Sequence, residues 1–159
     1  MSYKRFGIMI ATSTVVMFVL MYLNTYQADH VFFSQTRLWM AVIMGATMAA
    51  VMIGFMWSMY PNPRANIVIV AVAALAFVAA LGLVRSQATV DDVSYMRAMI
   101  PHHSIAVLTS RRAHISDPRV RELADQIIEA QVREIAEMKA LIADLSEQGA
   151  QSDQSTAEP

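Results

Sequence analysis

The residues best suited to chemistry are methionines and histidines that follow one another closely in the C-terminal half of the chain. Met96, Met99, His102 and His103 lie in one short stretch, and His114 follows. In a helix, at about 100° per residue, Met96, Met99, His103 and His114 would share one stripe, with His102 on its flank. Imidazole binds copper in either oxidation state, and thioether sulfur favours Cu(I). The spacing therefore predicts a copper site; the alternative is core methionines beside partly exposed histidines.

Pro101 directly precedes the two adjacent histidines. A proline inside a helix removes one backbone hydrogen bond and bends the helix locally. Such a bend could turn His102 and His103 toward a common centre.

A second helix, predicted from residue 118 to about residue 147, has apolar residues at a spacing of three and four. One interpretation is a packed seam of Val120, Ala124, Ile127, Gln131, Glu134, Met138, Leu141 and Leu145. In that seam Gln131 and Glu134 are buried polar residues that need partners, and they would support a metal site that includes Met138. The alternative is a core of Leu123, Ile128, Ile135 and Ile142, with Glu134 in solvent.

Three apolar segments precede these helices, at about residues 7–23, 38–60 and 65–84, and the second and third contain no charged residue. About 20 apolar residues suffice for a helix to cross a bilayer. The turn at residues 61–64 (PNPR) predicts that the second and third segments form an antiparallel hairpin.

The sequence therefore predicts an all-α protein in three parts. Residues 1–85 form a membrane anchor of three transmembrane helices, and residues 86–148 form a soluble antiparallel helical hairpin. Asp117 and Pro118 are a strong start signal for the second helix of the hairpin. We expect Gly149 to end that helix and residues 149–159 to be a disordered tail.

Lys4, Arg5 and Arg64 favour a cytoplasmic N-terminus, which places the hairpin and the loop 24–36 on the outer side. For a bacterial protein this is the inner membrane, with a periplasmic C-terminal domain.

A row of methionines at a spacing of four runs through the second segment (Met40, Met44, Met48, Met52 and Met56). Either it guides Cu(I) or, more simply, it fills apolar space. Small residues at positions 46, 50 and 54 predict a helix-packing face.

The amino-acid composition supports a membrane protein and argues against nucleic-acid binding and cysteine chemistry. Of 159 residues, 56% are hydrophobic and 16% are charged, and the net charge is −1. Because Lys and Arg are scattered, we expect no nucleic-acid partner. The absence of cysteine excludes thiol catalysis and disulfides, whereas methionine is abundant, at 13 residues.

Three motifs carry a resemblance to a known family: residues 96–106 (MRAMIPHHSIA), 117–121 (DPRVR) and 127–138 (IIEAQVREIAEM). They resemble the family called domain of unknown function 305, whose members are ferritin-like helical proteins that include copper-binding proteins of the bacterial envelope. The resemblance covers about residues 90–145, and the three-helix anchor resembles a membrane-bound subset. It implies metal ligands at Met99, His102, His103 and Met138, with Met96 and His114 as further candidates. Arg111 is a departure, because members often have an acid there.

The expected function is binding of copper, as Cu(I) or Cu(II), for sequestration or for transfer to another protein. The alternative is a membrane-anchored interaction module without metal. We expect no enzyme, because no Glu-x-x-His pair for a di-iron centre and no Ser/His/Asp arrangement is present. Since a family bundle has four helices and a hairpin supplies two, we also expect a homodimer.

Overall fold

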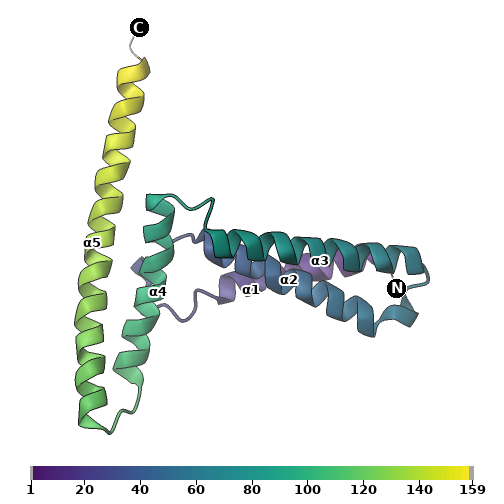
Figure 1. Cartoon of the computed structure of the whole chain (residues 1–159), viewed down its shortest axis with the longest axis horizontal. Helices are drawn as coiled ribbons and strands as arrows, with labels where there is room; N and C mark the ends of the chain where they lie inside the picture. The colour runs from purple at the N-terminus through teal and green to yellow at the C-terminus, as the bar shows by residue number, and fades with distance from the viewer. Residues whose placement is uncertain (1, 158–159) are drawn as a thin grey trace. The chain divides into compact units, whose positions relative to one another are not determined.

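A computed structural model of the chain describes residues 2–157, with side chains up to residue 149. Within these residues the chain is helical and contains no strand. The helices form two compact units, which are described separately. The first unit comprises the chain up to Leu23 and Gln35–Thr89, and the second comprises Asn24–Ser34 and the chain from Val90 onward. Figure 1 shows both units.

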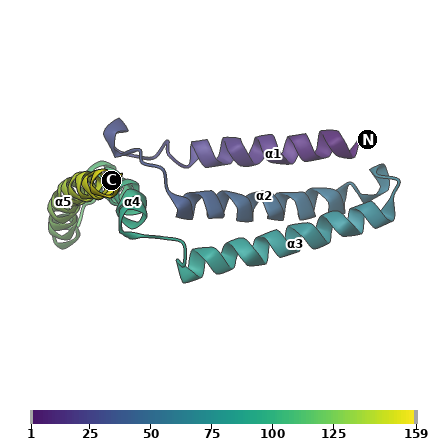
Figure 2. The ribbon, with the colours of Figure 1, turned by 90° about the horizontal axis from the view of Figure 1, so that it is seen from above.

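The first unit consists of α1 (Tyr3–Leu20), α2 (Gln35–Phe55) and α3 (Pro63–Ser86). The three helices lie side by side, with α2 between α1 and α3 (Figure 2). Each is long and apolar enough to cross a membrane. The prediction of three such helices is confirmed, although α2 ends at Phe55 and a short 3₁₀ helix, η2 (Trp57–Met59), follows it.

The turn between α2 and α3 is held by side chains as well as by its prolines. Asn62 caps α3 by accepting hydrogen bonds from the N–H groups of Arg64 and Ala65, at 3.1 and 3.2 Å. Asn66, which is fully buried, accepts a hydrogen bond of 2.8 Å from the Tyr3 hydroxyl. The predicted antiparallel hairpin of α2 and α3 therefore forms, and α1 is tied to its turn.

Small residues bring α1 and α2 together, but not in the predicted stripe. A Cβ atom on Gly45 would collide with the Thr14 hydroxyl, so this glycine marks the closest approach of the two helices. Of the predicted small residues, Ala46 is buried, whereas a Cβ on Gly54 would meet nothing. The predicted packing face is therefore confirmed at Ala46 but not at Gly54.

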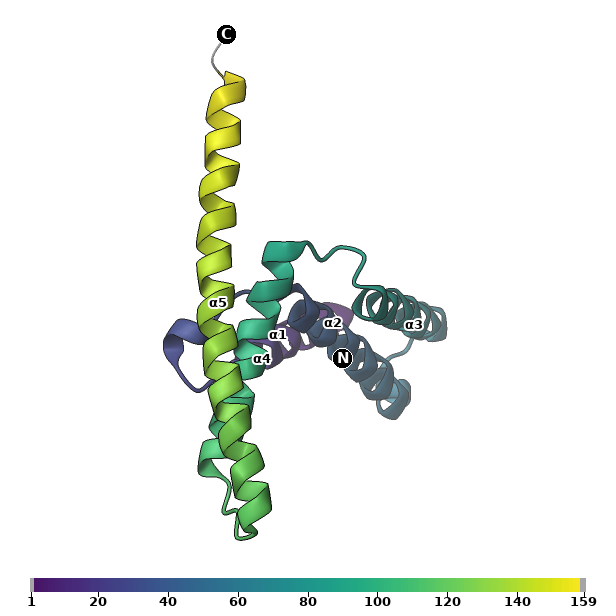
Figure 3. The ribbon, with the colours of Figure 1, turned by 60° about the vertical axis from the view of Figure 1, so that its left-hand side comes forward.

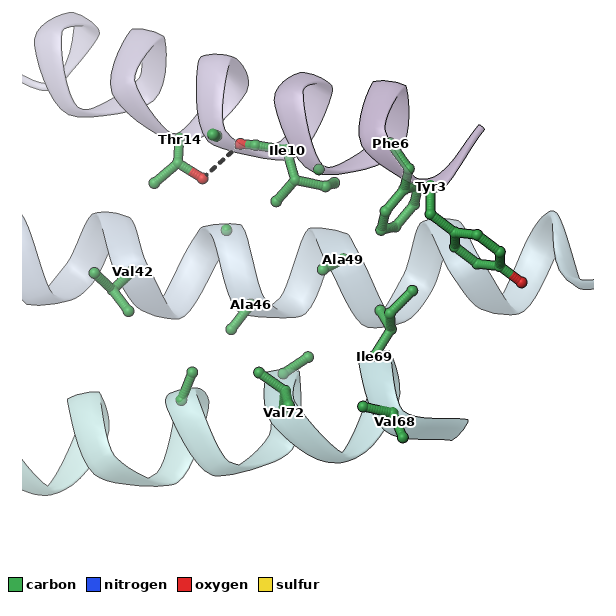
Figure 4. Close-up of a pocket in the computed structure, with 15 residues that line it drawn as sticks. Tyr3, Phe6, Ile10, Thr14, Val42, Ala46, Ala49, Val68, Ile69 and Val72 are labelled. Atoms are coloured by element: carbon green, nitrogen blue, oxygen red, sulfur yellow. Dashed lines mark hydrogen bonds between the residues drawn. The ribbon is translucent and has the colours of Figure 1, made fainter. Parts of the chain in front are cut away.

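An apolar cavity of about 560 Å³ is lined by residues of all three helices, as Figure 4 shows. Thr14 is one of its few polar linings, and its hydroxyl is already bonded to the carbonyl of Ile10 at 2.8 Å.

The second unit consists of α4 (Asp92–Arg112), α5 (Pro118–Ala157) and the segment Asn24–Ser34, which contains a short 3₁₀ helix, η1 (Ala28–His30). α4 and α5 form the predicted antiparallel hairpin, and α5 extends well past the start of α4 (Figure 3). The predicted end of the second helix near Gly149 is wrong, because α5 continues to Ala157. The predicted tail is thus helical up to that residue, and residues 158 and 159 lie outside the described chain.

The side-chain caps explain where the hairpin helices begin. Asp91 accepts a 2.7 Å hydrogen bond from the N–H of Ser94 at the start of α4. Asp117 accepts a 2.9 Å hydrogen bond from the N–H of Arg119 at the start of α5. Acceptors at these positions satisfy N–H groups that have no partner inside the helix.

The core of the second unit is small and centres on Met96, Ile100, Ile135 and Ile142. Seven of the buried and half-buried residues of α5 follow one another at alternating spacings of four and three, which is the pattern of a two-helix seam: Ala124, Ile128, Gln131, Ile135, Met138, Ile142 and Leu145. The actual seam lies between the two predicted ones. It takes Ala124, Gln131, Met138 and Leu145 from the first and Ile128, Ile135 and Ile142 from the second.

Candidate metal site on the helical hairpin

A groove of about 480 Å³ runs between α4 and α5. Its lining includes four of the predicted site residues: Met96 and His103 from α4, and Glu134 and Met138 from α5. The remaining lining residues are Asp92, Tyr95, Glu137, Leu141 and Leu145. The antiparallel hairpin therefore brings together residues that are up to 42 positions apart (Met96 to Met138).

The helix repeat explains why these four side chains converge. Met96 and His103 are seven residues apart, which is two helical turns, and so lie on the same side of α4. Glu134 and Met138 are four residues apart and share a side of α5 in the same way. Met96 is buried in the core, at 7% exposure, and Met138 packs against it. Both thioethers thus stand where the core meets the groove.

Glu134 is the polar partner of His103. Its Oε2 lies 3.1 Å from Nδ1 of His103 and accepts a 3.3 Å hydrogen bond from Nε2 of Gln131. The His103 contact is close but does not have the geometry of a hydrogen bond, so Nδ1 is buried without a hydrogen-bond partner. A carboxylate beside one ring nitrogen favours a proton there and leaves the lone pair of the other nitrogen, Nε2, for a metal.

The surroundings favour the neutral form of the His103 imidazole. Burial lowers the pKa of His103 below its usual value, and His102 acts in the same direction, while the charge of Glu134 opposes both. A neutral imidazole is the form that binds a metal, because protonation removes the lone pair.

The other predicted ligands do not line the groove. Met99 is half-buried, and His102 is exposed, with its ring centroid 6.1 Å from that of His103. Pro101 lies inside α4 as predicted, and His103 lines the groove whereas His102 does not. His114 is exposed beyond Arg112, the last residue of α4.

The groove is acidic, since Asp92, Glu134 and Glu137 line it and no Lys or Arg does. Even so, among the described residues no three His, Asp or Glu side chains are close enough to hold a metal ion. The donors that could complete a set around His103 within one chain are the sulfurs of Met96 and Met138. Two thioethers and an imidazole suit a soft ion such as Cu(I).

Sequence reasoning missed the role of the segment Asn24–Ser34, which packs on the hairpin. Ser104, fully buried in α4, accepts a 2.8 Å hydrogen bond from the N–H of Tyr26 and lies 2.9 Å from Nδ1 of His30. His30 is itself buried, and Phe32 packs against the core. Asp29 accepts a 2.6 Å hydrogen bond from Lys139 of α5.

Arg111, the residue that departs from the family pattern, also contacts this segment. Its guanidinium donates a 2.8 Å hydrogen bond to the Tyr26 hydroxyl and lies 5.1 Å from the centre of the Tyr26 ring. The sequence contains one indication of this contact. Three predicted membrane crossings put the loop 24–36 and the hairpin on the same side, which implies that they are near each other but does not predict that they touch.

The fold and site thus define a small helical hairpin domain in a chain with three membrane-type helices. Residues 92–159 match the family described as "Domain of unknown function (DUF305)", as the motifs predict. Over 61 residues the chain is 43% identical to an uncharacterized protein of Acanthamoeba polyphaga mimivirus. That alignment covers 37% of this chain and 40% of the viral protein. No solved structure matches the chain.

Proposed function

We propose that this protein binds copper at the groove between α4 and α5, to sequester the ion or pass it to a partner protein. One observation carries the proposal: Met96, His103 and Met138 line the same groove, with Glu134 beside the imidazole. Thioethers and a neutral imidazole match Cu(I), and the three acidic linings favour a cation. The proposed role is binding rather than catalysis.

Glu134 would act through His103. In protein metal sites the second nitrogen of a histidine ligand usually donates to a carboxylate, which fixes the ring and makes the ligand more basic. The 3.1 Å approach of Glu134 to Nδ1 and the hydrogen bond from Gln131 to the same oxygen support that role.

We further propose that the chain resides in a bacterial inner membrane, with the N-terminus in the cytoplasm and the hairpin in the periplasm. Three crossings put the connection between α1 and α2 on the same side as the chain after α3. The packing of Asn24–Ser34 within the hairpin unit supports this arrangement, since both must then be outside the lipid. The direction follows from Lys4, Arg5 and Arg64.

The test is a Cu(I) titration of the full-length protein in lipid nanodiscs, in competition with a chromogenic Cu(I) chelator and without oxygen. The double variant Met96→Leu/Met138→Leu removes both sulfurs at nearly constant volume, so the hairpin keeps its packing. Because even the loss of a supporting residue weakens metal sites by about 10–100-fold, we expect at least a tenfold loss of affinity.

Two variants serve as matched controls. Met48→Leu removes a thioether from α2, and His114→Asn removes an exposed imidazole beyond α4. Both should bind Cu(I) like the unmodified protein. Equal affinity of the Met96→Leu/Met138→Leu variant and the unmodified protein would refute the proposed site.

The exposed apolar residues of α5 favour a second candidate function, an interaction module that needs no metal. Val120, Leu123 and Leu141 are 49%, 56% and 45% exposed. This alternative predicts association that a chelator does not change and purified protein that contains no copper by elemental analysis.

A further inference from the structure

The two sides of the hairpin differ. The segment Asn24–Ser34 covers one side through its contacts with Ser104 of α4 and Lys139 of α5. The groove opens on the other side, where Tyr95 and Leu141 line it and yet are 54% and 45% exposed. We call this second side the open face.

The open face carries one stripe from each helix. On α4, Met99 and His102 follow Tyr95 at spacings of four and three, and thus lie on its side of the helix. On α5, Glu134 and four exposed apolar residues share one side by the same repeat; the apolar residues are Val120, Leu123, Ile127 and Leu141. Neither stripe contains Lys or Arg.

The groove is a half-site in a single chain. Its donors come from one hairpin and are open on the outer side, whereas Met99 and His102 stand on the same face but outside the lining. A second open face placed over the first would supply the missing wall.

We propose that the open face pairs with the open face of a second copy of this chain, and that Met99 and His102 of each copy then face the groove of the other. The inference rests on the proposed copper binding and adds that the complete site is shared between two chains. Such a pairing is isologous, because the same surface is used on both sides. It would bury the apolar stripes of α5 and complete a four-helix bundle of the ferritin-like kind.

The charge of the face indicates that pairing depends on metal. Two copies bring together two sets of Asp92, Glu134 and Glu137 with no Lys or Arg among them, and these carboxylates repel one another. A bound cation offsets that repulsion. By linkage, copper must then strengthen the dimer by the same factor by which the dimer strengthens copper binding.

A second copy is the favoured partner because the membrane concentrates it. Helices anchored in one bilayer confine the hairpins to a thin layer, which raises their effective concentration and fixes the axis of pairing along the membrane normal.

The experiment measures the mass of the full-length protein in mild detergent by sedimentation equilibrium, with a Cu(I) chelator and with one equivalent of Cu(I). Bound copper per chain is determined on the same samples. We expect Cu(I) to lower the dimer dissociation constant at least tenfold. Leu123→Gln/Ile127→Gln should abolish this dimer, whereas Val132→Gln, a change at 48% exposure on another side of α5, should not.

The variant Met99→Leu/His102→Asn tests the shared site, since it leaves the groove of each chain intact. It should retain copper binding through Met96, His103 and Met138 but lose the strengthening of the dimer by Cu(I). If the unmodified protein binds one Cu(I) per chain and stays monomeric, the shared site is refuted and the proposed function stands. If it binds no copper, the proposed function fails, and the shared site fails with it.

Discussion

The buried hydroxyl of Ser104 takes part in two of the contacts that hold the segment Asn24–Ser34 on the hairpin, and removing this hydroxyl gives a sharp prediction. Ser104→Ala is nearly isosteric but leaves the N–H of Tyr26 and Nδ1 of His30 without their 2.8 and 2.9 Å partner. Each buried polar group left without a partner costs about 1–3 kcal/mol. The N–H of Tyr26 is only partly buried and contributes about 1 kcal/mol, so with about 1–3 kcal/mol for Nδ1 of His30 docking of the segment should weaken by about 2–4 kcal/mol.

That loss can be measured as local opening. Since each 1.4 kcal/mol is a factor of ten, amide exchange in residues 24–34 should accelerate about 30- to 700-fold. Hydrogen–deuterium exchange with mass spectrometry on the protein in nanodiscs reports this region separately from α4 and α5. Amides in the middle of α5 should change much less, because the core of Ile100, Ile135 and Ile142 is untouched.

Ser110→Ala is the matched control, since Ser110 is a half-buried serine of the same helix. It should leave exchange in residues 24–34 unchanged. If the amide exchange rates of residues 24–34 in Ser104→Ala stay within threefold of those in the unmodified protein, the Ser104 hydroxyl does not hold the segment. The cost assigned to the two polar groups left without a partner would then be wrong.

Three further changes test other parts of the structure. Burial and the Lys139 charge lower the pKa of His30, so the docked segment binds a proton less readily than the undocked one. Docking of the segment should therefore be complete above about pH 6.5 and weaken as the pH falls below that value. His30→Gln should flatten this dependence in the exchange assay, and an unchanged pH profile would contradict the assignment. Glu134→Gln should weaken Cu(I) binding about 10–100-fold in the chelator competition, whereas equal affinity would remove Glu134 from the site. Gly45→Ala should destabilise the anchor by about 1–3 kcal/mol in thermal unfolding, with rescue by Thr14→Ala, while Gly54→Ala, where a Cβ has space, should not.

The parts of the fold that depend on local sequence, such as long apolar runs and helix caps, were predictable. Three charge-free apolar runs fix three helices, and Asp91 and Asp117 mark the starts of α4 and α5 through caps that can be read locally. The end of α5 was not predictable, because a single Gly149 lowers helix stability without forbidding the helix.

Some residues of the groove could be predicted singly from the sequence, but their grouping could not. Periodicity placed Met96 and His103 on one side of a helix, and the groove confirms that they lie together. Two seams of α5 fitted the apolar pattern almost equally, so the sequence could not decide which residues face α4. Ser104 and His30 meet through a contact between distant residues, which leaves no periodic trace.

The discontinuous make-up of the hairpin unit has a consequence for how the chain is made. The residues that hold His30 and Asp29 come 74 and 110 positions later in the chain. At about 5–20 residues per second, the segment Asn24–Ser34 emerges about 4–20 s before its binding surface exists. During that interval α2 and α3 are synthesised, while Phe32 and His30 have no core to enter. The segment therefore cannot complete its docking before α4 and the first part of α5 are made, and any chain that stops after α3 leaves this part unassembled.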